Sequence, residues 1–215
     1  MDELILSAAA AAAQLAGPFP GSTLAAYTRA CSALLRELGA IRHRMETINS
    51  EIFTLTYGSI VRQLITDLED LEEVNKQLDT MGYNIGIRLI DEFLAKSKTT
   101  KCVDFRDTAD KIARIGFRMF LSASASVSSW NADNTACNLV LEDNPLVDFV
   151  ELPESCSSLK FCNVLCGVIR GALEMVNIRV ECTIAKDTLK GDDATELHLK
   201  LLSHGAESYP FKDDD

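Results

Sequence analysis

The most constraining feature of this sequence is a pair of short segments near its C-terminal end in which apolar and polar residues alternate. Residues 180–184 and 197–201 both alternate in this way, and Lys190-Gly-Asp-Asp193 lies between them. Successive side chains of a strand point to opposite faces, and a Gly/Asp-rich stretch favours a turn. The two segments therefore predict an antiparallel hairpin with one packed face and one wet face.

The segments before this hairpin have the periodicity of helices. Apolar residues recur at helical spacing in residues 51–68, which follow Ser50 as a candidate N-cap, and in residues 74–95. A third helix is predicted from an Asp104 cap to Leu121, with Asp107 near its positive end.

The central part of the chain completes the predicted fold. Short strands are expected at residues 126–130, 137–142 and 147–152. Residues 157–178 predict a nearly buried helix, since a membrane span would carry Arg170 and Glu174 inside it. Helices first and strands later predict an α+β fold, with helices layered on one side of an antiparallel sheet.

The length and composition favour one domain with tails. A chain of 215 residues that is 47% apolar can bury one sizeable core. We expect a flexible N-terminal extension (1–46), a globular domain (47–203) and an acidic C-terminal tail (204–215). The apolar stretch at residues 4–16 is not predicted to be a signal peptide, because acidic residues stand where a signal peptide has positive charge.

Charge and cysteine usage exclude several classes of function. A net charge of −11 disfavours nucleic acid as a partner, because nucleic acid is bound mainly through Lys and Arg. The seven cysteines include no C-x-x-C pair, which favours the reducing cytosol. Cys162 and Cys166 lack a histidine to complete a zinc site, so no metal is expected, and no histidine has the neighbours of a catalytic pair.

Cys102 differs from the other cysteines in its surroundings. It follows Lys101 and precedes a predicted helix N-terminus, and both features favour the reactive thiolate. A local basic region surrounds it on an otherwise acidic chain, comprising Lys96, Lys98, Lys101, Arg106, Lys111, Arg114 and Arg118. From the residues alone, a reactive thiol and an inert exposed thiol both remain open.

Two groups of small residues are candidates for a groove. Ala109, Ala113 and Gly116 lie in line on the predicted third helix, and Gly167 and Gly171 repeat the pattern on the apolar helix. Such a line lets another element or an alkyl chain approach closely. The residues alone favour the first of these, close helix–helix packing.

The helix at 51–68 carries two apolar strips. One contains Phe53, Tyr57, Ile60, Leu64 and Leu68, and the second contains Ile52, Val61 and Ile65. A lone surface helix needs only one apolar face. The second strip indicates either a partner interface or a central helix buried in its own domain, and both remain open.

Several long strings carry a resemblance to a known family. In order along the chain they are EIFTLTYG (51–58), VNKQLDTMGYNIG (74–86), NPLVDFVELP (144–153), LCGVIRGALEMV (165–176) and DTLKGD (187–192). They resemble the acylated small-subunit family of the trafficking protein particle (TRAPP) vesicle-tethering complex, over about residues 50–202.

The resemblance implies an α/β plait in which helices cover one side of a twisted four-stranded antiparallel sheet. It implies a non-catalytic subunit that forms a homodimer or heterodimer and contacts other TRAPP subunits through its early helices. The complex activates a Rab-type GTPase in endoplasmic reticulum-to-Golgi transport, so the expected location is cytoplasmic, peripheral to cis-Golgi and endoplasmic reticulum membranes.

The resemblance also implies a covalent lipid in place of a cofactor. Members of the family carry palmitate on a cysteine that follows a basic residue, and Lys101-Cys102 occupies that position here. The acyl chain lies in an internal channel, for which Ala109, Ala113, Gly116, Gly167 and Gly171 become candidate walls. Ile52, Val61 and Ile65 become candidate interface residues.

Part of the chain falls outside the resemblance, and an alternative function is kept. Residues 1–45 and the acidic end are unmatched, and Met45 is a second candidate start. The alternative is a stand-alone small-ligand sensor or thiol enzyme that uses the same cavity.

Overall fold

The computed structural model describes residues 49–97, 99 and 102–205. In this part of the chain four antiparallel strands form one sheet in the order β1-β2-β4-β3. The strands are β1 (Ala125–Ser128), β2 (Ala136–Leu141), β3 (Ile178–Lys186) and β4 (Thr195–His204). The helices are α3 (Ser50–Leu68), α4 (Leu71–Lys96), α5 (Phe105–Lys111), α6 (Phe117–Leu121) and α7 (Asn163–Glu174), with short turns η1 (Ile112–Gly116), η2 (Pro145–Val147), η3 (Glu154–Cys156) and η4 (Thr188–Lys190).

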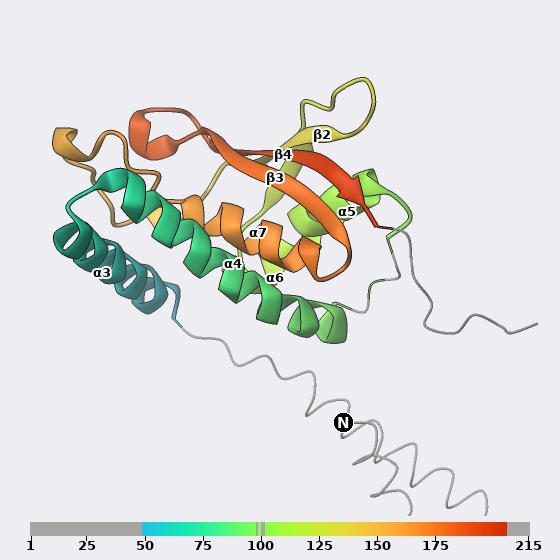
Figure 1. Cartoon of the computed structure of the whole chain (residues 1–215), viewed down its shortest axis with the longest axis horizontal. Helices are drawn as coiled ribbons and strands as arrows, with labels where there is room; N and C mark the ends of the chain where they lie inside the picture. The colour runs from blue at the N-terminus through green and yellow to red at the C-terminus, as the bar shows by residue number, and fades with distance from the viewer. Residues whose placement is uncertain (1–48, 98, 100–101, 206–215) are drawn as a thin grey trace, which may run out of the picture. The chain divides into compact units, whose positions relative to one another are not determined.

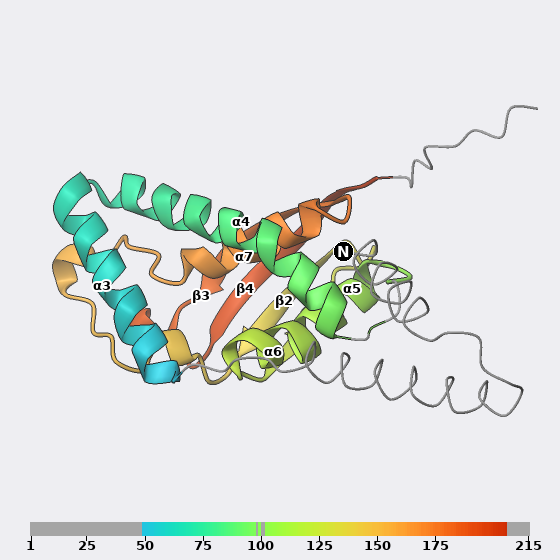
Figure 2. The same cartoon turned by 90° about the horizontal axis from the view of Figure 1, so that it is seen from below.

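The helices cover one side of the sheet, which confirms the predicted α+β fold. In Figure 1 α7 lies between the strands and α4, and in Figure 2 the helices stand in front of β2, β3 and β4. The predicted hairpin is confirmed as β3 and β4, which pair antiparallel and are joined through η4.

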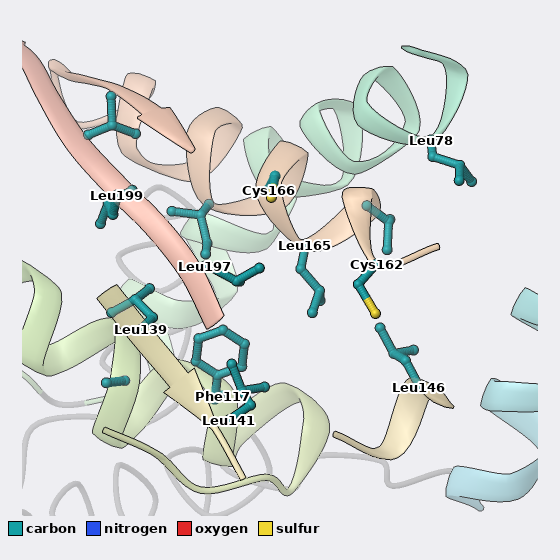
Figure 3. Close-up of a cluster of buried hydrophobic side chains, with 14 of the residues drawn as sticks. Leu78, Phe117, Leu139, Leu141, Leu146, Cys162, Leu165, Cys166, Leu197 and Leu199 are labelled. Carbon is teal, nitrogen blue, oxygen red and sulfur yellow. The ribbon is translucent and has the colours of Figure 1, made fainter. Parts of the chain in front are cut away.

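The covered face of the sheet supplies one side of the core. Leu139 on β2 pairs with Leu197 on β4, and Cys137 pairs with Leu199, and all four side chains are buried. Because strand side chains alternate, their neighbours Asn138, Glu196 and His198 fall on the other face. Figure 3 shows the buried side chains of the sheet facing Leu165 and Cys166 of α7 and Phe117 of α6.

Glycines allow α4 and α7 to lie in close contact. A Cβ atom added to Gly82 or Gly86 would collide with the backbone of α7, and one added to Gly167 or Gly171 would collide with the backbone of α4. The residue numbers of the contacts increase together along both helices, so α4 and α7 run in the same direction. With no side chains between them, the two helices approach more closely than ordinary packing permits.

Polar side chains fasten the surface of this contact. Arg170 of α7 forms an ion pair with Asp79 of α4, and its guanidinium lies 4.9 Å from the centre of the Tyr83 ring. The Tyr83 hydroxyl donates a hydrogen bond to Glu174 Oε2 at 3.1 Å. These polar contacts fix how α7 is placed along α4, which the glycine contact alone does not determine because it has few side chains.

Helix α3 is attached to the domain along one face. Thr54 Oγ1 donates to the carbonyl of Pro145 at 3.0 Å, and the buried Tyr57 hydroxyl donates to the carbonyl of Phe161. Val61 is 2% exposed and completes this face. The other sides of α3 make no such attachment among the described residues.

Two sequence-based boundaries are corrected by the structure. The strand expected at residues 147–152 is wrong, because Asn144 caps the helical turn η2 and the chain then continues in turns. The helix expected at 157–178 is shorter, because Asn75 of α4 binds the backbone of Ser158 and Lys160 and holds this stretch outside the helix.

The glycine contact gives a stability prediction. We expect Gly167→Ala to lower the free energy of unfolding by about 3 kcal/mol, because its methyl group meets the rigid backbone of α4 rather than a movable side chain. Urea unfolding followed by circular dichroism measures the change.

Gly58→Ala on α3 is the matched control. A Cβ atom there has open space around it, so removing a glycine from a helix interior raises stability by about 0.5–1 kcal/mol. Equal stability of Gly167→Ala and the unmutated chain would contradict the close contact.

Candidate functional site

The Cys102 thiol is half-buried and lies just before α5. Val103 and Asp104 separate it from the first helical residue, Phe105, and Asp104 is the N-cap. Lys101, the basic neighbour expected from the sequence, lies outside the described residues. The position of Cys102 is therefore set by how the chain enters α5.

Two aspartates fix this entry by reciprocal hydrogen bonds. Asp104 Oδ1 accepts the backbone N–H of Asp107 at 2.7 Å, and Asp107 Oδ2 accepts the backbone N–H of Val103 at 3.1 Å. Both bonds satisfy N–H groups at or before a helix start, which otherwise lack partners. The residue next to Cys102 is thus held from within α5.

A lysine on α5 brings positive charge to the thiol. Lys111 Nζ lies 2.8 Å from Asp107 Oδ2, and its side chain is 15% exposed. The hydrogen bond to Asp107 is the largest cause that raises the pKa of Lys111, and a charge interaction and a hydrogen bond with Cys102 also raise it. The pKa of Asp107 is lowered in turn, first by Lys111 and then by the N–H of Val103.

In the sequence, Lys111 was only one member of the basic region, and Lys101 was the predicted source of positive charge near the Cys102 thiol. The available signal was the i,i+4 pair of Asp107 and Lys111, which places both side chains on one side of a helix. What the sequence did not show is that the chain before Asp104 turns back toward this side.

A line of buried residues leads from this site into the core. Phe105, Ala109, Ala113 and Phe117 are all 8% exposed or less. Residues four apart drift around a regular α-helix, but the π-helical turn η1 is wider and keeps Ala113 and Phe117 in line. Gly116 is half-buried, and a Cβ atom there would meet nothing within 4 Å.

The other two candidate channel residues require a correction. Gly167 and Gly171 face the backbone of α4, where an added Cβ atom would collide with Asp79 or Tyr83. Their small size serves the packing of α7 on α4, so this contact leaves no space for an acyl chain beside them.

The exposed apolar surface of α3 differs in detail from the expected interface. Of the expected residues, Ile52 is 63% exposed, Ile65 is half-buried, and Val61 is buried in the chain's own core and offers no surface to a partner. The large exposed side chains are Ile52, Phe53, Leu55 and Ile60, which we call the α3 apolar surface. Periodicity placed Phe53 and Ile60 on one strip with Tyr57, but the attachment through Thr54, Tyr57 and Val61 leaves both of them exposed.

Other candidate chemistry finds little support in the described residues. Cys162 and Cys166 are buried, and burial raises the pKa of the Cys162 thiol to about 12, so that thiol stays protonated. Within the same residues, no group of three or more metal-binding side chains comes together, and no helix has the length and apolar character needed to cross a membrane. His198 Nδ1 lies 2.8 Å from Asn138 Oδ1 on the outer face of the sheet, His204 ends β4, and His43 lies outside the described residues.

Comparison with known proteins places these features in a family. The profile of the family described as Transport protein particle (TRAPP) component matches residues 53–200. Trafficking protein particle complex subunit 3 of Dictyostelium discoideum is 55% identical over 160 residues, covering 74% of this chain and 86% of that protein. Trafficking protein particle complex subunit BET3 of Saccharomyces cerevisiae is 41% identical over 175 residues, covering 80% of this chain and 91% of that protein.

A solved structure is also similar to this chain. The structure of a trafficking protein particle complex subunit 3 from Naegleria fowleri covalently bound to palmitic acid has a TM-score of 0.72 and 49% identity. The match covers 75% of this chain and 100% of the Naegleria fowleri chain.

The Asp107 interactions predict a pH-dependent contribution to stability. The folded-state pKa of Asp107 lies below the ordinary value of 3.8. The ionised Asp107 therefore contributes fully to the free energy of unfolding at pH values above 3.8, and this contribution is lost as the pH falls through the folded-state pKa. We expect Asp107→Asn to lower the melting temperature at about pH 6 and to differ little from the unmutated chain at about pH 2.5.

Thermal unfolding at a series of pH values tests this. Asp148→Asn, which changes an exposed carboxylate on a different turn, serves as the control. A deficit for Asp107→Asn that stays constant across the acid range would rule out a charge-dependent role.

Proposed function

The chain belongs to the transport protein particle (TRAPP) component family, and on that premise we propose that it is a non-catalytic, fatty-acylated scaffold subunit of the TRAPP vesicle-tethering complex. The acyl group is attached to Cys102, and α3 carries the contact with another subunit. The observation that carries the proposal is the half-buried thiol beside Lys111, at the start of a line of buried small and aromatic residues.

The acyl group fits the surroundings of Cys102. The relative from Naegleria fowleri is covalently bound to palmitic acid, and Cys102 is partly exposed and has Lys111 as a neighbouring cation. We propose that the chain runs along Ala109 and Ala113 toward the open space at Gly116. Small side chains there would let an alkyl chain lie close to the helix backbone.

The free energy gained by burying the acyl chain is large enough for the lipid to act as part of the hydrophobic core. At about 0.8 kcal/mol per buried CH₂, a palmitoyl chain contributes roughly 10 kcal/mol as an upper bound. That figure is comparable with the net stability of a whole domain, about 5–15 kcal/mol. A single acyl chain in a bilayer anchors only weakly, which also favours a buried position.

Assembly is assigned to the α3 apolar surface. Its residues are large and apolar, and from Glu51 to Ile60 the only charged residue is Glu51. Interface cores are depleted of charge and rich in such side chains. A second copy of this chain or another TRAPP subunit is the proposed partner at this surface.

The wider role follows from membership of the complex. We propose that the chain has no active site of its own and supports nucleotide exchange on a Rab-type GTPase through the assembled complex. Its place of action is endoplasmic reticulum-to-Golgi transport, at the cytoplasmic side of cis-Golgi and endoplasmic reticulum membranes.

The acyl proposal predicts a modified protein. Intact-mass measurement of protein purified from eukaryotic cells should show one fatty acyl adduct that hydroxylamine removes, since hydroxylamine cleaves thioesters. Cys102→Ser should lack the adduct and melt at a lower temperature, because the buried chain is lost.

Cys156→Ser is the matched control, since Cys156 is also half-buried but lies in η3. It should keep the adduct and the melting temperature. Unmodified protein whose melting temperature is unchanged by Cys102→Ser would contradict a structural acyl group, and turnover that vanishes with Cys102→Ala in an isolated monomer would favour the thiol-enzyme alternative.

The assembly proposal predicts a separable defect. Replacing Ile52 and Leu55 together by Asp should abolish co-purification of other TRAPP subunits, because charges in an apolar contact are not compensated. Both side chains are more than half exposed, so the fold and the acyl adduct should remain.

Gln63→Glu, an exposed change on the same helix, controls for added charge on α3. Normal recovery of partner subunits with the Ile52 and Leu55 double variant would remove α3 from the interface.

A further inference from the structure

Three exposed arginines follow one line along the helix that runs from α5 through η1 to α6. They are Arg106, Arg114 and Arg118, and we call them the arginine surface. Steps of four residues drift around a regular α-helix, but the π-helical turn η1 has more residues per turn and keeps the three side chains in line. The line is roughly 18 Å long, because each residue of a helix adds about 1.5 Å.

The arginine surface lacks the carboxylate partners that other cations of the domain have. The cations that do form ion pairs with Asp or Glu are Lys76, Lys96, Lys111, Arg170, Arg179, Lys186 and Lys200. Within the described residues, no carboxylate forms an ion pair with Arg106, Arg114 or Arg118. Asp110 lies in the same line but is half-buried. On a chain with 32 acidic and 21 basic side chains, a group of three unpaired cations is an exception.

Strand β4 ends near this surface. The backbone N–H of Leu201 on β4 donates to the carbonyl of Thr135 at 2.7 Å, and the backbone N–H of Thr135 donates to Asn131 Oδ1 at 2.8 Å. Asn131 follows Trp130, and the Arg106 guanidinium lies 5.5 Å from the centre of the Trp130 ring. Figures 1 and 2 both show β4 ending at the end of the domain where α5 lies.

The segment that follows β4, residues 206–215, has the charge and the length to cover the arginine surface. It contains Glu207, Asp213, Asp214 and Asp215 against one lysine. The eight residues after Gly205 span up to about 26 Å when extended, which exceeds the length of the arginine line. Arginine pairs with carboxylates through two parallel hydrogen bonds. A short tether also gives the segment an effective concentration on the order of millimolar at a nearby site.

We propose that residues 206–215 bind the arginine surface, with the carboxylates of the last three residues pairing with its guanidinium groups. The net charge of −11 supports this occupant, because it repels the segment from most of the domain and repels the domain from an anionic membrane. The segment bound there covers the three cations. Other anions gain access to the arginine surface only when the segment leaves it.

Zero-length cross-linking tests the contact. Arg118→Lys keeps the positive charge and supplies an amine, which a carbodiimide joins to a carboxylate in direct contact. Full-length protein is cross-linked, the monomer is isolated, and linked peptides are identified by mass spectrometry. The pair of Lys186 and Glu196, 2.7 Å apart, is the positive control in every sample. Arg88→Lys, an exposed change on α4, is the matched negative control.

We expect Arg118→Lys to link residue 118 to one of the last three aspartates within a monomer, and Arg88→Lys to give no link from residue 88 to them. Raising the salt concentration from about 0.1 M to 1 M should lower the yield of this link about fivefold relative to the control pair, because the Debye length falls from about 10 Å to about 3 Å.

The fluorescence of Trp130 gives a second measure without a cross-linker, because Trp130 is the one tryptophan of the chain. Iodide is an anion and is attracted to uncovered arginines. Replacing the last three residues by Asn should therefore raise the iodide quenching constant about twofold at constant ionic strength, and change quenching by neutral acrylamide little. Adding Arg114→Gln and Arg118→Gln to that variant should remove the increase.

Four results would overturn the inference. The first is the absence of a link from residue 118 to residues 206–215 in samples where Lys186 and Glu196 are linked. The second is a link that forms only between two copies of the chain or to another protein. The third is equal iodide quenching of the unmutated and the Asn-substituted chain. The fourth is binding of the unmutated chain to phosphatidylserine vesicles that Arg114→Gln with Arg118→Gln abolishes, which would assign the arginine surface to a membrane.

Discussion

The close contact of α4 and α7 is the constraint from which the rest of the domain follows. Glycines at 82, 86, 167 and 171 remove the side chains between the two backbones, and no other residue fits there. The contact holds α7 between the sheet and α4 (Figure 1), so both faces of α7 are covered, which accounts for the apolar character of this helix. Asn75 of α4 then binds the chain that enters α7, and one helix thereby sets both the position and the start of the other.

The thiol site depends on local interactions that are individually small. Two aspartate hydrogen bonds, one ion pair and a π-helical turn place Cys102, Lys111 and the buried line from Phe105 to Phe117 together. An ion pair at a surface contributes little to stability. Its importance here is geometric, because it ties Lys111 to the same carboxylate that binds the backbone N–H of Val103 beside Cys102. The site is therefore built from α5 and its continuation, with little help from the sheet.

Much of the fold could be predicted from the sequence, because alternation in β3 and β4 and helical periodicity in α3 and α4 are local signals. The strand expected at 147–152 failed for a tertiary reason, since the buried Asn144 binds Cys162 and Thr195 and caps η2 instead. Cys102 was predicted as the site from its sequence neighbours, whereas the link from Lys111 through Asp107 to Val103 depends on how the chain turns before α5. Gly167 and Gly171 show the same limit, because a line of small residues looks alike whether it faces a lipid or a helix. Only the position of Tyr83 and Asp79 decides between them.

The two proposed roles lie on different elements, and this separation has a consequence for how they interact. Figures 1 and 2 show α3 and α5 at opposite ends of the helical layer. The proposed path of the acyl chain and the α3 apolar surface are therefore formed by different elements. We expect the acyl chain to affect assembly through the stability of the core that both elements share. Helix α3 contributes Tyr57 and Val61 to this core, and α5 contributes Phe105 and Ala109. Burial of the acyl chain contributes roughly 10 kcal/mol, which is comparable with the net stability of a whole domain. Loss of the lipid would therefore destabilise the domain that holds α3 in place, without changing the α3 apolar surface itself.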